Sequence, residues 1–226
     1  AGVLGRDSVV GIRLALQYIE QQGLPTLPRL RVLLGDTKSK RSTAVTIAKR
    51  FVEEEQATFL CGVVNSSVAI QVTEIAASAD AFFVGTDHAS SRLTDEFFHD
   101  RYFRVTNDTR QSMTAGALFI RDYFDDHLKE KPLRISYLGP DYEYGYQVWA
   151  DFREALHRLG VNYEIAGALW PRLSEPDYSH YINELIRQEP DLVVNSLWGG
   201  DFVAFVTQAT DTRLFDVSRF ANFEKG

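Results

Sequence analysis

Apolar residues recur along this chain with two different spacings. Segments in which they return every three or four residues are typical of amphipathic helices, and short apolar runs are typical of buried strands. In residues 6–22, for example, Val9, Ile12, Leu16 and Ile19 would share one face of a helix. Over the first half the pattern predicts helices at 6–22, 42–55 and 66–79, and strands at 31–34, 59–64, 81–84 and 102–105.

The second half repeats this alternation. Met113, Ala117, Ile120 and Phe124 give one of its helices an apolar face. The pattern predicts helices at 110–127, 143–159, 177–188 and 200–210, and strands at 133–138, 161–169, 192–197 and 219–223. Strands that alternate with helices of this length indicate βαβ units and parallel sheets. We therefore expect an α/β protein with two doubly wound, Rossmann-like lobes, divided near residues 106–109, and a ligand cleft between them.

Composition narrows the class of protein. The 226 residues include 24 Lys or Arg and 31 Asp or Glu, so the formal charge is −7, and the pI is near 5.3. An acidic chain is poorly suited to nucleic acid, because phosphate binding needs a basic face. The longest apolar runs fall well short of the roughly 18–20 residues that span a bilayer. We expect a globular protein with no nucleic-acid partner and no membrane insertion of this segment.

The sequence contains none of the common motifs for catalysis or for metal and cofactor binding. Cys61, the only cysteine, lies in the apolar stretch 59–63, which favours a buried core residue and excludes an intrachain disulfide. The five histidines form no pair with metal-ligand spacing, and no glycine-rich phosphate loop or nucleophile elbow is present. We expect no metal, no cofactor and no enzymatic activity.

The expected fold places a binding site at one edge of each sheet. In open parallel sheets, ligands bind beyond the carboxyl ends of the strands. Asn65, Ser66 and Ser67 lie at such a junction, where a predicted strand ends and a helix begins. A serine beside the unpaired N–H groups of a helix N-terminus suits a small carboxylate or phosphate. The alternative is an ordinary cap that serves only the helix.

Aromatic and charged residues follow other predicted strands. Tyr144 belongs to a cluster of three tyrosines after residues 133–138, and Trp198 follows residues 192–197. Glycine and proline lie beside both, which favours a loop and a ligand platform over core packing. His88 could contact a ligand or occupy a surface turn, and Glu224 could receive a ligand ammonium or remain a solvated acid. The residues by themselves leave these alternatives open.

A set of short motifs, in a fixed order along the whole chain, resembles one known family. The first motif is Gly5-Arg6-Asp7-Ser8, followed by Gly11-Ile12 and Leu14-Ala15. Further matches are Asp36, Gly62–Ser67, Leu93-Thr94, Phe103–Val105, Gly139–Gly145, Asp191–Val194, Trp198–Asp201 and Gln208-Ala209. Together they resemble the type I periplasmic binding proteins, specifically the leucine/isoleucine/valine-binding branch.

This resemblance implies an extracytoplasmic solute-binding protein. Such a protein would capture a branched-chain-like amino acid or a related small carboxylate, aromatic ones included, and deliver it to an ABC permease. It would be periplasmic, secreted by means of a signal peptide that is then removed. A second hypothesis is the ligand-sensing domain of a receptor or regulator with the same fold.

The resemblance also implies a ligand site built from eight residues. Ser66 would hold the ligand carboxylate, and the turn at 87–89 would form a companion wall. Tyr144 and Trp198 would be aromatic contacts from the second lobe. Glu224 would pair with an α-ammonium. The full set is Asn65, Ser66, Asp87, His88, Ala89, Tyr144, Trp198 and Glu224.

Two features depart from the family's pattern. Asp87 and His88 stand where relatives have small residues, and the aspartate would repel a ligand carboxylate unless it faces away or His88 is protonated. The family's opening strand and its last third have no counterpart in this sequence. We therefore expect an N-terminal lobe of residues 1–106 that lacks its first strand, and an incomplete C-terminal lobe of residues 107–226.

Overall fold

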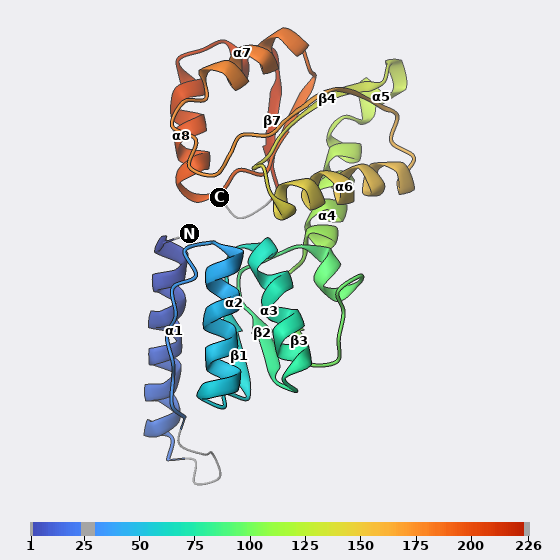
Figure 1. Ribbon diagram of the computed structural model, residues 1–226. Helices are drawn as coiled ribbons and strands as arrows, with labels where there is room; N and C mark the ends of the chain where they lie inside the picture. The colour runs from blue at the N-terminus through green and yellow to red at the C-terminus, as the bar shows by residue number, and fades with distance from the viewer. Residues whose placement is uncertain (1, 24–29, 224–226) are drawn as a thin grey trace. The chain divides into compact units, whose positions relative to one another are not determined.

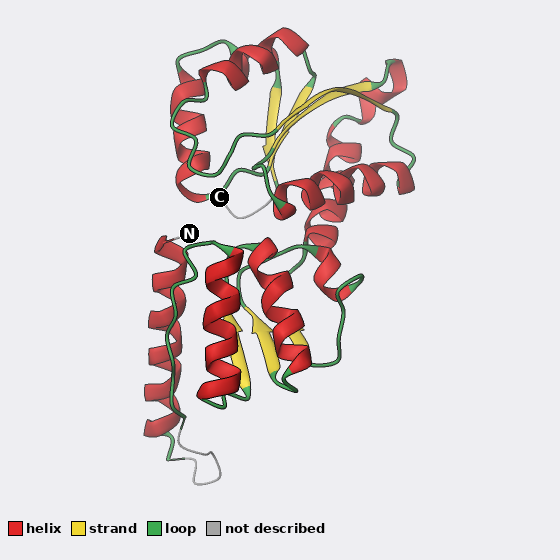
Figure 2. Cartoon of the chain, in the orientation of Figure 1, coloured by secondary structure: helices red, strands yellow, loops and turns green. Residues whose placement is uncertain are grey.

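The chain divides into two compact units, Ala1–Thr106 and Asn107–Gly226, called here the N-terminal and C-terminal units. The structure is a computed structural model that describes residues 2–23 and 30–223. Each unit combines a parallel β-sheet with helices (Figures 1 and 2). The prediction of an α/β protein with parallel sheets is confirmed.

The N-terminal unit contains a three-stranded sheet in the order β1-β2-β3, with both pairs of strands parallel. Its elements are α1 (Gly2–Gln21), α2 (Arg41–Lys49), the π-turn η1 (Arg50–Glu54), β1 (Phe59–Gly62), α3 (Ser66–Ser78), β2 (Phe82–Gly85), the 3₁₀ turn η2 (Ser91–Thr94) and β3 (Tyr102–Arg104).

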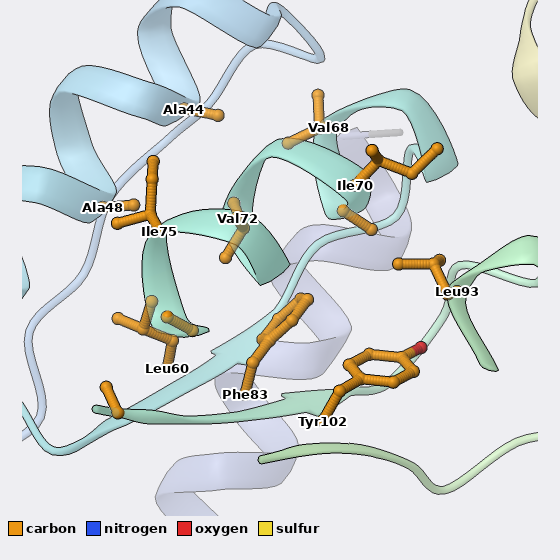
Figure 3. Packing of buried hydrophobic residues seen from close by; sticks show 13 residues of the cluster. Ala44, Ala48, Leu60, Val68, Ile70, Val72, Ile75, Phe83, Leu93 and Tyr102 are labelled. Atoms are coloured by element: carbon orange, nitrogen blue, oxygen red, sulfur yellow. The ribbon is translucent and has the colours of Figure 1, made fainter. Parts of the chain in front are cut away.

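Helix α3 is the centre of the N-terminal core. Val68, Val72 and Ile75, spaced at helical intervals, are buried. They pack with α2 and with Phe83 of β2 on one face of the sheet (Figure 3). This packing fixes α3 against the strands, and with it the position of the helix N-terminus.

The other face of this sheet, called here the outer face, is only partly covered. It consists of Phe59 and Cys61 of β1, Phe82 and Val84 of β2, and Phe103 of β3, which are aligned by the register of the strands. Phe59 is 66% exposed and Phe103 is 53% exposed. Cys61 is exposed as well, so the prediction of a buried cysteine is wrong. A short apolar run predicts a strand but does not show whether both of its faces are covered.

The predicted strand at 31–34 does not form. Residues 30–36 have no regular secondary structure, and the apolar side chains of Leu30, Val32 and Leu34 are exposed. A strand needs a partner for its backbone hydrogen bonds, and no described strand pairs with this segment. Helix α1 does form, and its predicted apolar residues are half-buried rather than buried.

The C-terminal unit contains a four-stranded parallel sheet in the order β5-β4-β6-β7. Its elements are α4 (Thr109–Tyr123), α5 (Asp125–Glu130), β4 (Leu133–Leu138), α6 (Glu143–Arg158), β5 (Tyr163–Leu169), α7 (Ser179–Gln188), β6 (Leu192–Asn195), α8 (Gly199–Thr210), α9 (Leu214–Val217) and β7 (Arg219–Asn222). The helix predicted at 110–127 is interrupted at Phe124, and α9 was not predicted.

Helices cover this second sheet on both faces (Figure 1). On one face α7, α8 and α9 pack against Leu138 of β4 and Val193 of β6. On the other, Tyr137 of β4 stacks on Trp149 of α6 with ring centroids 4.8 Å apart. All four residues of β6 are consequently buried, which matches the continuous apolar run in its sequence.

Candidate functional site

In the N-terminal unit the candidate site lies where β1 leads into α3. Asn65 is the N-cap of α3, and its Oδ1 accepts hydrogen bonds from the backbone N–H groups of Ser67 at 2.9 Å and Val68 at 3.3 Å. Ser66 is 1% exposed, and its Oγ accepts a hydrogen bond from the backbone N–H of Ser90 at 3.4 Å. The first turn of α3 is therefore fixed to the segment that follows β2.

Ser67 is the residue of this turn that sequence reasoning left without a role. Its side chain is buried, and its Oγ has no hydrogen-bond partner within the described residues. A buried hydroxyl without a partner is costly. It lies in the first turn of a 13-residue helix, whose N-terminal N–H groups and dipole favour negative charge. The turn is thus suited to a small anion.

The structure places His88 inside the core of the N-terminal unit. It is 1% exposed, its Nδ1 lies 2.9 Å from the carbonyl oxygen of Val63, and its Nε2 lies 2.8 Å from the hydroxyl of Tyr102. Burial, which disfavours the charged form, lowers the pKa of His88 to about 4. The neutral ring must donate from Nδ1, since a carbonyl only accepts, and Nε2 accepts from the tyrosine. The structure thus gives His88 a role in the core, and its predicted contact with a ligand stays a prediction.

Asp87, half-buried, is oriented by hydroxyl groups. Its Oδ2 accepts hydrogen bonds from Oγ1 of Thr86 at 2.8 Å and from Oγ of Ser8 on α1 at 3.2 Å. His88 cannot offset the charge of this carboxylate, because the imidazole is neutral near pH 7. The sequence left two ways for Asp87 to avoid repelling a ligand carboxylate: it faces away, or His88 is protonated. Only the first is compatible with a neutral His88. The neighbouring Ala89 is half-buried.

In the C-terminal unit the aromatic residues of two strand-to-helix junctions meet. Tyr142 is the N-cap of α6 and Trp198 is the N-cap of α8. Trp198 donates a hydrogen bond from Nε1 to the hydroxyl of Tyr142 at 3.1 Å. Tyr144 is buried, and its ring centroid lies 5.9 Å from that of Tyr142. The structure therefore groups Trp198 and Tyr144 around Tyr142, at the carboxyl ends of β4 and β6.

Asn195, the last residue of β6, was missed by the sequence analysis. Its Oδ1 accepts from the backbone N–H of Leu197 at 2.9 Å and from Nδ2 of Asn222 at 3.0 Å. Its own Nδ2 is buried without a hydrogen-bond partner in the described part of the chain. The available signal was a polar residue that ends an apolar strand. Glu224 lies outside the described residues, and its role stays a prediction.

The described residues offer neither a metal site nor a membrane span. Within residues 2–23 and 30–223, no group of three or more His, Cys, Asp or Glu side chains is arranged to hold a metal ion. Among the described helices, none combines the length and the apolar character that a membrane span requires.

Comparison with known proteins identifies the family. A family model described as "periplasmic binding protein" matches residues 1–220, nearly the whole chain. The chain belongs to the periplasmic binding protein family. None of the curated proteins matches it. The resemblance that the motifs indicate is therefore confirmed.

Solved structures of periplasmic binding proteins share this fold. A periplasmic binding protein from Burkholderia mallei is 18% identical, with a TM-score of 0.77 over 86% of this chain and 49% of its own. An ABC transporter solute-binding protein from R. palustris, in complex with benzoate, is 17% identical, with a TM-score of 0.78 over 92% and 55%. A leucine-binding protein from Thermotoga maritima is 18% identical, with a TM-score of 0.74 over 92% and 56%. This periplasmic binding protein has the type I fold and spans about half the length of these relatives.

Proposed function

We propose that this chain is part of an extracytoplasmic solute-binding protein that captures an amino acid or a small aromatic carboxylate and delivers it to an ABC permease. Membership of the periplasmic binding protein family supports a binding role and an extracytoplasmic location. Solved relatives include a leucine-binding protein and a solute-binding protein in complex with benzoate. Leucine and benzoate both carry a carboxylate, which gives the chemical class of the proposed ligand.

The observation that carries the proposal is the first turn of α3. Ser66 and Ser67 are buried there, and the Ser67 hydroxyl has no hydrogen-bond partner in the described residues. Asn65 satisfies the backbone N–H groups of Ser67 and Val68, so a ligand would bind to the serine hydroxyls and to the N–H of Ser66. A carboxylate at this position would gain charge-assisted hydrogen bonds in a region largely removed from water.

The other residues that the resemblance implies stay predictions. Trp198 is half-buried at the carboxyl end of β6, and its ring would suit the apolar or aromatic body of a ligand. Tyr144 is buried near the carboxyl end of β4, and its ligand contact stays a prediction. Glu224 would distinguish amino acids from carboxylates that lack an ammonium. Asp87 is engaged with Thr86 and Ser8, and we propose that it positions the turn rather than contacting the carboxylate.

Calorimetry with L-leucine and 4-hydroxybenzoate as probes tests the proposal. We expect Ser66→Ala to weaken binding of the favoured probe by about 1.5–3 kcal/mol, the range for a hydrogen bond to a charged group. Ser67→Ala should also weaken binding, but by less than Ser66→Ala. The Ser67 hydroxyl has no hydrogen-bond partner in the described residues, whereas the Ser66 hydroxyl also holds the backbone of Ser90 in place.

The matched control is Ser78→Ala at the opposite end of α3, where the hydroxyl donates to the carbonyl of Ile75 at 2.9 Å. This variant should bind as the unchanged protein does. Equal affinity in folded Ser66→Ala would refute the carboxylate site. Failure of the unchanged protein to bind any amino acid or aromatic carboxylate would refute the proposed ligand class.

A further inference from the structure

Arg104 lies at the same edge of the N-terminal sheet as the candidate site. It is the last residue of β3 and is paired in register with Gly85, the last residue of β2. Asp87 follows Gly85 by two residues, and Ser66 begins α3 after the neighbouring strand β1. The carboxyl ends of three adjacent parallel strands therefore bring Arg104, Asp87 and Ser66 to one edge. The sequence analysis gave Arg104 no role in binding.

The guanidinium of Arg104 is connected to Ser66 through Ser90. Arg104 donates a hydrogen bond from Nη1 to the carbonyl oxygen of Ser90 at 2.9 Å. The backbone N–H of Ser90 in turn donates to Oγ of Ser66 at 3.4 Å. A second bond, from Nη2 of Arg104 to Oγ1 of Thr94 at 3.3 Å, holds the 3₁₀ turn that follows. Arg104 therefore fixes the segment that contacts the first turn of α3.

The charge of Arg104 acts in a region from which water is largely excluded. Arg104 is half-buried, whereas Ser90 is 0% exposed and Ser66 is 1% exposed. Interactions between charges are stronger where the effective dielectric constant is low. A positive charge that is separated from Ser66 by Ser90 would therefore favour an anion at the first turn of α3, and it adds to the positive end of the helix dipole.

Asp87 has the opposite effect at this edge. Its carboxylate is half-buried, and it would disfavour a ligand carboxylate through its field even when it faces away, because like charges repel. Burial is the main cause of the lowered pKa of His88; the charge of Arg104 also lowers this pKa, and the charge of Asp87 raises it. Both charges therefore act, with opposite signs, on the buried ring next to Asp87.

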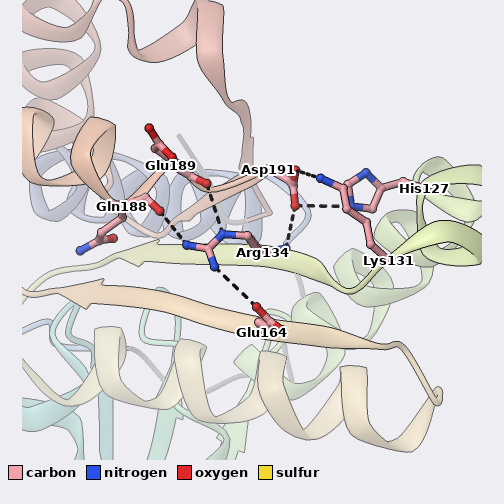
Figure 4. A network of polar contacts seen from close by, with 7 residues as sticks. All are labelled: His127, Lys131, Arg134, Glu164, Gln188, Glu189 and Asp191. Carbon is pink, nitrogen blue, oxygen red and sulfur yellow. Dashed lines mark hydrogen bonds and ion pairs between the residues drawn. The ribbon is translucent and has the colours of Figure 1, made fainter.

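Arg134 of the C-terminal unit provides a contrast. Its guanidinium donates to the backbone carbonyl oxygens of Gln188 at 3.0 Å and Glu189 at 3.4 Å. Its charge is paired with Glu164 at 3.5 Å (Figure 4). Arg134 is exposed and lies near the amino end of β4, at the sheet edge opposite the candidate residues of its unit. It thus fixes a segment of backbone, as Arg104 does, without a charge near a candidate binding residue.

We propose that Arg104 makes the candidate site selective for a carboxylate, because its charge, held in place by Ser90, offsets the charge of Asp87. This inference rests on the proposed function, since it concerns the same ligand. Arg104 is then a specificity-determining residue that acts through its field and does not need to touch the ligand. The affinity for a carboxylate should depend on the balance between these two charges.

Calorimetry on the full chain with 4-hydroxybenzoate and L-leucine tests the role of Arg104. Arg104→Gln should weaken binding of the favoured probe by about tenfold, as expected for one charge that acts over several ångströms at an effective dielectric constant of about 20. Arg104→Lys keeps the positive charge and a donor for Ser90, so it should lose only about threefold. Equal losses in the two variants would mean that Arg104 acts only by holding the backbone, and would overturn the proposal.

Arg134→Gln is the matched control. It removes one positive charge and a guanidinium that donates to backbone carbonyls, but at an exposed position where water and salt screen the charge. It should therefore bind the probe within about twofold of the unchanged protein. Circular dichroism of each variant shows whether it is folded.

Asp87→Asn tests the other half of the balance, and it does so even if Arg104→Gln fails to fold. Asparagine keeps an oxygen that can accept from Thr86 or Ser8 but has no charge. Binding of the favoured probe should become about threefold tighter. Unchanged affinity in the folded variant would show that the charge of Asp87 does not reach the ligand, which contradicts the proposal.

Ser66→Ala separates this inference from the proposed function. If Ser66→Ala weakens binding while Arg104→Gln binds as Arg134→Gln does, the proposed function stands and the role of Arg104 is wrong. If folded Ser66→Ala binds as the unchanged protein does, or if the unchanged protein binds neither probe, the carboxylate site and the role of Arg104 are both rejected.

Discussion

The two sheets of this protein differ in how many of their faces are covered. In the C-terminal unit, every residue of β6 is buried, because α4 and α6 lie on one side of the sheet and α7, α8 and α9 on the other. In the N-terminal unit, β1 alternates between a buried Leu60 and exposed neighbours. Both sheets are parallel, so strand direction alone does not ensure two covered faces.

The comparison shows what the candidate site requires. The inner face of the N-terminal sheet holds α3 through a continuous apolar core (Figure 3), and the N-terminus of α3 presents Ser66 and Ser67. The side chains of the partly covered outer face do not belong to the core that holds α3. We therefore expect a substitution in the covered core of the C-terminal unit and one on the outer face of the N-terminal sheet to have unequal consequences.

Core truncation should give the largest effect. Phe205→Ala in α8 removes a ring that is fully buried and stacks on Phe220 with centroids 5.7 Å apart. The resulting cavity should lower the free energy of unfolding of the C-terminal unit by about 3–5 kcal/mol. Because Trp149, Trp170 and Trp198 all belong to this unit, tryptophan fluorescence during denaturant unfolding measures it specifically.

The same truncation on the outer face is the control. Phe59→Ala removes a ring that is 66% exposed and stacks on Phe82 at 5.3 Å. It should cost less than about 1 kcal/mol, since little surface is returned to water, and it should leave the fluorescence transition unchanged. Similar losses from the two substitutions would contradict the contrast between the sheets.

The sequence predicts the order of the elements well, because periodicity records which face of each helix is apolar. The boundaries of β4 coincide with the predicted strand 133–138, and Met113, Ala117, Ile120 and Phe124 are all buried as predicted. The predicted strand at 31–34 and the buried Cys61 failed for a different reason. Both depend on which neighbours cover a segment, and periodicity within a segment does not contain that information.

The candidate site was predicted in part. The strand-to-helix junction at Asn65 and Ser66 was predicted because a helix cap has a local sequence signal, although the cap is Asn65 rather than a serine. The burial of His88 was not predicted, because it depends on Phe83 and Tyr102, which stack around it. The unpartnered Oγ of Ser67 and Nδ2 of Asn195 were not predicted, since an unsatisfied polar atom becomes visible only when every neighbouring donor and acceptor is known.

The buried His88 should make the N-terminal unit sensitive to acid. Its pKa is lowered to about 4 from the ordinary 6.5 because burial disfavours the charged ring. Between these values the unfolded chain binds a proton that the folded unit does not, so stability falls as the pH decreases. From pH 7 to pH 5 we expect a loss of about 2 kcal/mol, at 1.36 kcal/mol for each unit of pKa. Far-UV circular dichroism during denaturant unfolding, compared with fluorescence, isolates this unit.

His88→Phe is the matched variant. It should lower stability at pH 7, because the carbonyl of Val63 and the hydroxyl of Tyr102 lose their partner. Its stability should then depend less on pH than that of the unchanged protein over the same range. If the two proteins keep equal slopes between pH 5 and pH 7, another group causes the acid sensitivity.

The helix caps give the smallest effects and the sharpest comparison between the units. Asn65→Ala and Asp108→Ala each remove a side chain that caps a helix, α3 in the N-terminal unit and α4 in the C-terminal unit. The expected cost is about 0.5–2 kcal/mol. Asn65 is buried and Asp108 is half-buried, so water can reach the second cap more readily than the first. We expect Asn65→Ala to lower the free energy of unfolding more than Asp108→Ala does. The effect of Asn65→Ala should appear in the dichroism transition, and that of Asp108→Ala in the fluorescence transition.

Asn65→Asp then separates the cap from the ligand site. An aspartate keeps the oxygen that accepts from Ser67 and Val68, so the unfolding free energy should change by less than about 0.5 kcal/mol, as for exchanges among good N-caps. Its added negative charge would lie beside the turn where a ligand carboxylate is proposed to bind, and like charges repel. Calorimetry should therefore show weaker binding of the carboxylate probe with nearly unchanged stability. A parallel loss of both quantities would mean that Asn65 acts only through the helix, and unchanged binding would place the carboxylate elsewhere.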